Sequence, residues 1–247
     1  MNFFKPKKSS KVYIEGSELS FRVKRYLYRF LISKRKLSTK NLERLCKDYA
    51  TNMKTLIVHS EDVNYKPYFP NAYTVTKRLN LECNMHMDLY YRDLRKIEDN
   101  SFEVVICTGL LEHVPDPYLL VEDLRRICKV GGKVIISASS VFSYHEGPDD
   151  FFHFTPYSMK LLLNKFSKIE MIRGSSQPFE TIGILIQRVL IQCDIFPLIR
   201  PFIEFLAIII PFLDKFIVFQ FDTNQKKTKD RLIDSMMPSN IQAAAIK

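Results

Sequence analysis

The stretch from Asp99 to Ser137 constrains the fold more than any other part of this 247-residue chain. It begins with an apolar, β-branched run at residues 102–107, which is typical of a strand buried on both faces of a parallel sheet. After a Pro-Asp-Pro start signal, apolar residues recur at helical spacing over residues 118–128. Gly131-Gly132 is expected to end that helix, and residues 133–137 to form a second buried strand. This order predicts a βαβ crossover in a parallel sheet.

In parallel sheets, ligands bind beyond the carboxyl ends of the strands. The loop that follows the first of these two strands runs from Thr108 to Pro117. We therefore expect the functional residues of this stretch to lie in that loop.

The same residues carry a family resemblance. The sequence SFEVVICTGLLEHVPDP, followed by a helix and then KVGGKVIIS, resembles the second half of a class I S-adenosylmethionine (SAM) dependent methyltransferase domain of type 11. The resemblance implies an α/β fold with a doubly wound, mostly parallel seven-stranded sheet of the Rossmann-like kind, and SAM as the cofactor. It also implies that the Glu-His-Val-Pro loop borders the donor pocket, with contacts from Thr108, Leu110, Glu112 and His113.

The first strand of such a domain is expected at residues 54–58. In the family a Gly-x-Gly turn follows it, because only glycine lets the backbone approach the donor so closely. Here the corresponding residues are His59, Ser60, Glu61 and Asp62. Either the loop is rebuilt, with His59 and Glu61 beside the donor and Glu61 or Asp62 meeting its ammonium group, or donor binding is lost.

The second and third strands are expected at residues 72–76 and in the segment 84–94. Thr76 stands where the family usually has an acid that holds the ribose hydroxyls. Asp88 matches the position that commonly contacts the adenine amine, and Leu89 adjoins it. Asp88 could equally cap a turn.

The segment 141–157, VFSYHEGPDDFFHFTPY, is expected to cover the acceptor site. It resembles a loop in methyltransferases of bacterial cell-surface polysaccharide synthesis. His145, His153 and Asp149 are the candidate catalytic residues, because methyl transfer to a hydroxyl needs a positioned base. The alternative is that Asp149 and Asp150 cap a helix that starts near Pro156.

Charge and hydropathy divide the chain into four parts. We predict a basic N-terminal helical segment at residues 1–50, a methyltransferase-like core at 51–175, an apolar helical insert at 176–225, and a C-terminal strand within 226–247 that completes the sheet antiparallel to its neighbours. Residues 1–47 hold most of the formal net charge of +10, which fits a solvated face or an anionic membrane surface, whereas nothing in the pattern favours nucleic acid.

The apolar insert is interrupted by charged residues and prolines, and its longest uncharged run, residues 205–213, is too short to cross a bilayer. It can lie in the membrane interface, or form a cap or dimer face. Five scattered cysteines and the lack of a secretory signal predict a cytoplasmic protein, with the inner membrane face as a peripheral location.

The favoured hypothesis is SAM-dependent O-methylation of a small molecule, a sugar or a lipid-linked glycan at the membrane surface. The alternative is a catalytically inactive scaffold or binding module that keeps the fold. An NAD-binding enzyme is disfavoured, because the missing glycines are also needed for its pyrophosphate. No metal-ligand spacing was found in the sequence, so no metal site is predicted.

Overall fold

The computed structural model describes residues 36–59, 63–77, 82–88, 93–219 and 236–247. The basic helix expected at residues 17–33 lies outside them. The described helices are α2 (Lys36–Asp48), α3 (Pro117–Ile127), α4 (Pro156–Leu162), α5 (Pro178–Gln192) and α6 (Arg200–Ile209), with the 3₁₀ turns η2 (Asp93–Lys96), η3 (Leu111–His113) and η4 (Ile210–Phe216). The strands are β1 (Thr55–His59), β2 (Ala72–Thr76), β3 (Met85–His86), β4 (Phe102–Thr108), β5 (Cys128–Ser139), β6 (Lys168–Gly174) and β7 (Asn240–Ile246).

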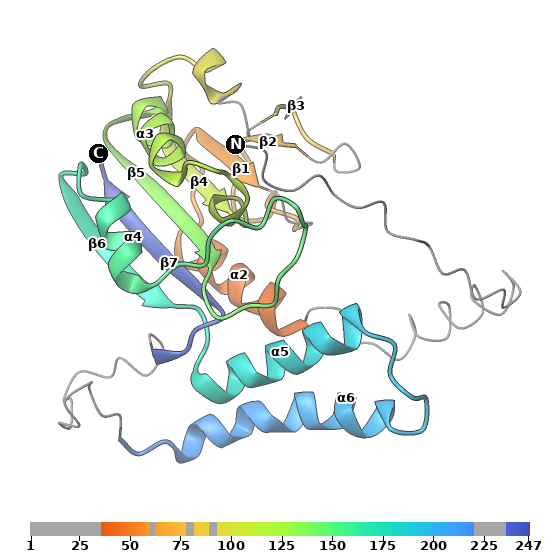
Figure 1. Cartoon of the computed structure of the whole chain (residues 1–247). Coiled ribbons are helices and arrows are strands. Elements are labelled where there is room, and N and C mark those ends of the chain that lie inside the picture. The colour runs from red at the N-terminus through yellow and green to blue at the C-terminus, as the bar shows by residue number, and fades with distance from the viewer. Residues whose placement is uncertain (1–35, 60–62, 78–81, 89–92, 220–235) are drawn as a thin grey trace, which may run out of the picture. The chain divides into compact units, whose positions relative to one another are not determined.

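The strands form one seven-stranded sheet in the order β3-β2-β1-β4-β5-β7-β6 (Figure 1). β1 to β5 pair in parallel, and β7 runs antiparallel to both of its neighbours. The strand order reverses between β1 and β4, which is where α/β sheets bind their ligands. The sequence prediction of a mostly parallel seven-stranded sheet closed by an antiparallel C-terminal strand is confirmed.

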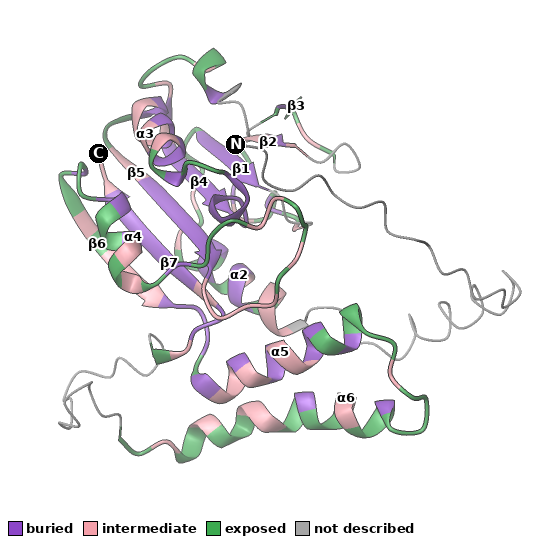
Figure 2. Ribbon diagram, in the orientation of Figure 1, coloured by how far each residue is buried: buried purple, intermediate pink, exposed green. Residues whose placement is uncertain are grey.

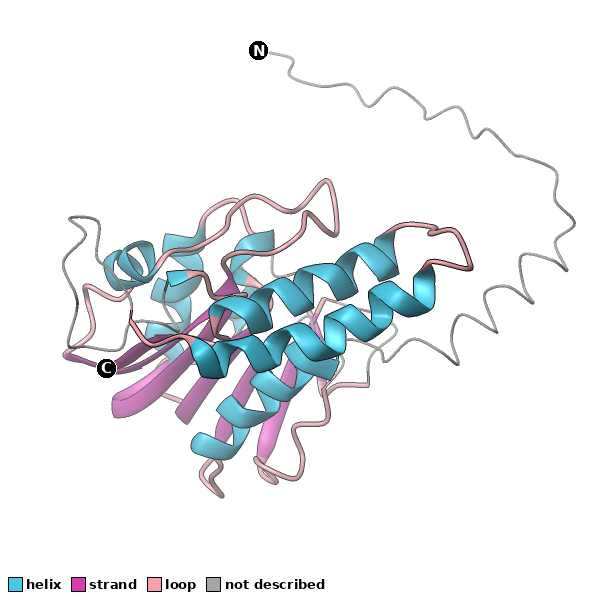
Figure 3. Cartoon of the chain, turned by 90° about the horizontal axis from the view of Figure 1, so that it is seen from below, coloured by secondary structure: helices cyan, strands magenta, loops and turns pink. Residues whose placement is uncertain are grey.

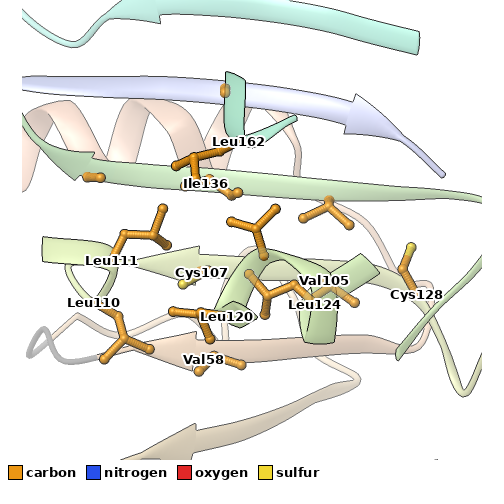
Figure 4. Packing of buried hydrophobic residues seen from close by; sticks show 14 of the residues in the cluster. Val58, Val105, Cys107, Leu110, Leu111, Leu120, Leu124, Cys128, Ile136 and Leu162 are labelled. Atoms are coloured by element: carbon orange, nitrogen blue, oxygen red, sulfur yellow. The ribbon is translucent and has the colours of Figure 1, made fainter. Parts of the chain in front are cut away.

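Alternate residues of the central strands face two apolar layers. Leu56 and Val58 pack on the side of α3 and α4, whereas Ile57 packs on the side of α2. Figure 4 shows the first layer, in which Leu120 and Leu124 of α3 lie against β4 and β5. Because both faces of the sheet are buried, the sequences of these strands are continuous apolar runs.

One expected boundary is wrong. Helix α3 ends at Ile127, and β5 begins directly at Cys128, so Gly131-Gly132 lies within the strand instead of ending the helix. Cys128 pairs with Phe102 and Lys133 pairs with Val104, with a register shift between the two pairs. The glycines accommodate that irregularity, because Gly131 has a positive φ of 76°.

The apolar insert forms a helical hairpin of α5, α6 and η4, which leaves the sheet after β6 and returns to it at β7 (Figure 1). Seen from below, α5 and α6 run side by side across one edge of the sheet (Figure 3). Within the described parts of the chain, no helix has both the length and the hydropathy needed to span a bilayer.

Candidate active site

The loop at the carboxyl end of β4 is anchored by two leucines. Leu110 and Leu111 are fully buried and point into the core beside Cys107 (Figure 4). This anchoring turns the following residues, Glu112 and His113, toward the ends of the neighbouring strands, and both are almost completely buried. Leu110 was predicted to border the donor, and the structure places its side chain in the apolar core.

Glu112 joins three segments at the edge of the sheet. Its Oε1 accepts hydrogen bonds from Oγ and the backbone N–H of Ser139 at the end of β5, at 2.7 and 3.3 Å. Its backbone carbonyl accepts from the N–H of Phe151 in the segment 141–153, at 2.8 Å. Its Oε2 has no hydrogen-bond partner among the described residues. Burial raises the pKa of this carboxyl group above its usual range.

His113 and His145 are brought together from distant parts of the sequence. Their rings meet edge to face, with centroids 4.8 Å apart. Nδ1 of His113 lies 2.7 Å from the carbonyl oxygen of Asp149, and Nδ1 of His145 lies 3.0 Å from that of Ser143. A carbonyl oxygen can only accept, so Nδ1 carries the proton in each ring. In the neutral form of either ring, Nε2 therefore keeps a lone pair.

The surroundings of His145 keep its imidazole neutral. Burial, followed by the nearby His113, lowers its pKa from 6.5 to about 4. Asp150 opposes this shift, because its carboxylate accepts from the backbone N–H of His145 at 2.8 Å and lies 3.4 Å from Nδ1. The balance leaves His145 with an available lone pair at neutral pH.

Two buried groups and the partly buried His145 have the geometry of a small cation site. One ligand atom each from Glu112, His113 and His145 lie within 4.8 Å of one another. Imidazole nitrogen and carboxylate oxygen are ligands for divalent transition metals. No sequence motif indicated this cluster, because His145 is far from the other two residues in the sequence and only the fold brings it close.

The other predicted residues of segment 141–157 surround this cluster. His153 Nε2 lies 3.6 Å from Asp150 Oδ1, on the opposite side of that carboxyl group from His145. Asp149 contributes its backbone carbonyl to His113. The alternative of Asp149 and Asp150 as helix caps is wrong, because Thr155 caps α4 in a reciprocal capping box with its third residue.

At the carboxyl ends of β1 and β4, the side chains of three residues pack together. Buried His59 packs against the ring of Tyr65 with centroids 5.1 Å apart. The Tyr65 hydroxyl shares a buried 2.7 Å hydrogen bond with Thr108 at the end of β4. Tyr65 was not identified from the sequence, where no spacing pattern links it to Thr108.

The remaining predicted donor residues lie apart from this contact. Asp88 is exposed beyond β3, and both β2 and β1 lie between β3 and β4. Thr76, which stands where the family usually has the ribose acid, is buried at the end of β2. Glu61 and Leu89 lie outside the described residues. The structure thus brings Thr108 and His59 together on one side and Glu112, His113 and His145 on the other.

Helix α5 supports the segment that carries His145. Arg188 donates from Nε to Oγ of Ser143 at 2.8 Å and lies over the ring of Phe142 at 4.9 Å. Gln192 donates to the carbonyl oxygen of Tyr144 at 2.8 Å. The helical hairpin is thereby joined to the candidate site.

A separate polar cavity of about 580 Å³ lies between α2, the end of β6, the start of α5 and η4. Arg44 donates to the carbonyl oxygen of Ser175, Arg173 is paired with Asp48, and Asp214 accepts from backbone N–H groups of α5. None of the residues predicted from the sequence lines it, and its main charged groups are engaged in structural contacts.

Residues 68–136 match the family model of the methyltransferase domain. This segment contains β2 to β4, α3 and the first part of β5, and therefore the loop with Glu112 and His113. A SAM-dependent methyltransferase from Archaeoglobus fulgidus has a similar structure, with a TM-score of 0.52 and 14% identity over 92% of this chain and 99% of that one. At this identity the likeness concerns the fold.

Two curated relatives match part of the chain. A ubiquinone biosynthesis O-methyltransferase of Neisseria meningitidis is 32% identical over 83 residues, which are 32% of this chain and 33% of the relative. One from Xanthomonas oryzae is 34% identical over 71 residues, which are 28% of this chain and 30% of the relative. The match spans about a third of the length of these relatives. No similarity to enzymes of polysaccharide synthesis is among these findings.

Proposed function

We propose that this chain, which has the fold of the class I SAM-dependent methyltransferases and matches their domain over residues 68–136, transfers a methyl group from SAM to a hydroxyl oxygen. The observation that carries the proposal is the coincidence of two independent findings. The matched segment contains the loop after β4, beside the point where the strand order reverses. Buried Glu112 and His113 and the partly buried His145 gather at the same edge of the sheet.

The described residues fit the donor in part. Beyond β3, Asp88 is exposed and acidic, as a contact to the adenine amine or ribose requires. Gly109 has a positive φ of 58°, which lets the backbone after β4 turn sharply beside the donor. At the end of β1, His59 and Tyr65 offer ring surfaces where the family has glycine backbone.

Bound SAM supplies a methyl group that is already activated on a sulfonium, so the protein has to position the acceptor and remove its proton. The lone pair on Nε2 of His145 is available for this step. The low pKa of His145 keeps it deprotonated at neutral pH, and buried Glu112 holds the loop that carries His113. A base in this place suits a hydroxyl acceptor, which has to lose its proton on methylation.

The relatives act, by their names, in ubiquinone biosynthesis as O-methyltransferases. This supports a phenolic hydroxyl as the first acceptor class. A sugar or lipid-linked glycan hydroxyl is the second class, which rests on the sequence of segment 141–157.

An inactive scaffold is the second candidate function. It is favoured by one observation, the buried contact of His59 with Tyr65 and of Tyr65 with Thr108, which fills the space at the end of β1 with side chains.

Isothermal titration with SAM and with S-adenosylhomocysteine distinguishes the two functions. We expect micromolar binding that Asp88→Ala weakens, whereas Glu98→Ala, which removes another exposed acid of the same region, leaves it unchanged. Absence of binding by a well-folded sample would favour the scaffold. Transfer of a labelled methyl group to phenolic or glycolipid acceptors then identifies the acceptor class. If adding a chelator is enough to abolish this transfer, the cluster of Glu112, His113 and His145 binds a divalent cation.

A further inference from the structure

The side of α6 and η4 that faces away from α5 carries only large apolar side chains. Eight of these side chains recur at helical spacing, and each is between 41% and 76% exposed. We define them as the outer face: Phe202, Phe205, Leu206, Ile208, Ile209, Phe212, Leu213 and Phe216. Figure 2 shows α6 largely exposed, with its buried positions toward α5. An exposed apolar patch of this extent marks an interaction surface.

The charged residues of this segment point the other way. Between residues 195 and 213 the only charged residues are Arg200 and Glu204. Buried Arg200 donates to the carbonyl oxygen of Leu190 at 2.9 Å and to Glu204 at 3.0 Å. The carboxylate of Asp214 accepts from two backbone N–H groups at the start of α5. The charged residues of the helix therefore contact the protein, alongside the apolar Ala207, and its outward side is apolar. An ordinary surface helix instead turns its charged residues to the solvent.

The rim of the outer face carries a cation. Lys215 is exposed, and its Nζ lies 5.3 Å from the centre of the Phe212 ring. A lysine whose stem lies along apolar surface while its ammonium reaches outward is typical of helices at a lipid headgroup layer.

We propose that the outer face of α6 and η4 lies in the interface of a lipid bilayer that contains anionic lipid. At 10 and 7 residues, α6 and η4 are too short to span the bilayer, but a helix lying in its surface needs no such length. Residues 1–47 hold fourteen Lys and Arg against three Glu, and this excess of positive charge attracts the chain to anionic headgroups and repels the same segment of a second copy. Charge thus favours lipid over self-association as the occupant of this face.

The chain contains no tryptophan, which provides a direct test. Phe212→Trp places a single indole on the outer face, and Tyr157→Trp places one at an 81% exposed position on α4. With vesicles of phosphatidylcholine and phosphatidylglycerol, we expect a blue shift of emission and quenching by brominated acyl chains for Phe212→Trp alone. Equal behaviour of the two variants would overturn the proposal.

Flotation with the same vesicles measures how much the outer face contributes to membrane binding. The triple variant Phe205→Ser, Phe212→Ser and Phe216→Ser is expected to lower the partition coefficient between water and vesicles about tenfold or more. The reason is that three rings that would enter the bilayer are lost. The matched control, Val130→Ser with Tyr157→Ser and Leu161→Ser, removes side chains that are 57% to 82% exposed elsewhere and should leave binding unchanged.

Two outcomes would reject the lipid assignment. One is absence of flotation by the folded wild-type chain. The other is a dimeric molar mass in solution that the outer-face variant converts to a monomer without any vesicle binding, which would make the face a contact between copies. Neither readout depends on methyl transfer, so failure here leaves the proposed function untouched.

Discussion

Tyr65 contributes to stability at the carboxyl edge of the sheet through one buried hydrogen bond, which it shares with Thr108. Tyr65→Phe removes the hydroxyl that pairs with Thr108 and leaves that threonine without this partner. We expect a loss of about 1 kcal/mol in the free energy of unfolding, the usual value for a buried neutral hydrogen bond. Urea denaturation measures it, with Tyr157→Phe at an exposed position as the control. A loss equal to that of the control would mean that the bond contributes nothing.

His145 makes stability depend on pH. Because its folded pKa, about 4, lies below the ordinary 6.5, the unfolded chain takes up a proton in this range that the folded chain does not. Its contribution is therefore complete above pH 6.5 and is lost as the pH falls toward 4. The midpoint of thermal unfolding should fall less between pH 7 and 4.5 in His145→Gln than in the wild type. His86→Gln, at an exposed position, should follow the wild type.

Single residues were predictable from the sequence where a local motif carried them. The Glu-His-Val-Pro loop is such a motif, and Glu112 and His113 do lie at the end of β4. The contacts of Tyr65 with Thr108 and of Arg188 with Ser143 depend on segments that only tertiary packing brings together. No periodicity or spacing indicates such contacts. The sequence could therefore indicate the loop and His145 as separate candidates, but not that they meet in one site.

Among the elements, apolar periodicity predicted the central strands and α3, and the bounds of β2 were predicted to the residue. The start of β5 was predicted wrongly, because a pair of glycines usually ends a helix. Here Gly131 and Gly132 lie inside the strand, where they accommodate a register shift. The hairpin was expected as short amphipathic pieces. The sequence did not indicate that the apolar side of α6 would face outward, because this depends on which side of α6 packs against α5. That choice is made by packing.

The close contact between α5 and α6 depends on Gly183. A Cβ atom at this position would lie 2.9 Å from the carbonyl oxygen of Ala207 and 3.1 Å from Pro211, so the helices would have to move apart. We expect Gly183→Ala to lower the free energy of unfolding by about 1–3 kcal/mol, even though alanine is the better helix former. Val189→Ala, at an exposed position of the same helix, is the control in the same denaturation measurement. Stabilisation by Gly183→Ala would contradict the packing argument.

Asp214 caps α5 from another part of the chain. Its two carboxylate oxygens accept from the N–H groups of Phe179 and Glu180, each at 2.8 Å. Asp214→Ala leaves these donors without that acceptor and removes a negative charge from the helix N-terminus, which should cost about 1–2 kcal/mol. Asp194→Ala, an exposed acid in the hairpin, should change stability little. Thermal unfolding with circular dichroism compares the two.

At the scale of the molecule, the reactivity of the five cysteines can be used to follow unfolding. Cys193 is exposed and should react first with iodoacetamide, whereas Cys46, Cys107 and Cys128 are buried. Burial raises the pKa of Cys107 well above its usual range and that of Cys128 to about 11, which further slows their reaction. Mass spectrometry over time should show these three modified together, at the rate of global unfolding. Early modification of Cys128 alone would indicate local opening of β5.

The hairpin leaves and rejoins the sheet at one point. The N–H of Ser175 after β6 donates to the carbonyl oxygen of Asn240 in β7 at 2.9 Å, and the hydroxyl groups of Ser176 and Ser239 are 3.0 Å apart. Because the two ends are held together by the sheet itself, doubling the length of the intervening chain costs only about 0.6 kcal/mol. The segment between them can therefore gain or lose residues at little cost to the sheet, provided that the contacts of α5 with Ser143 and Tyr144 are kept.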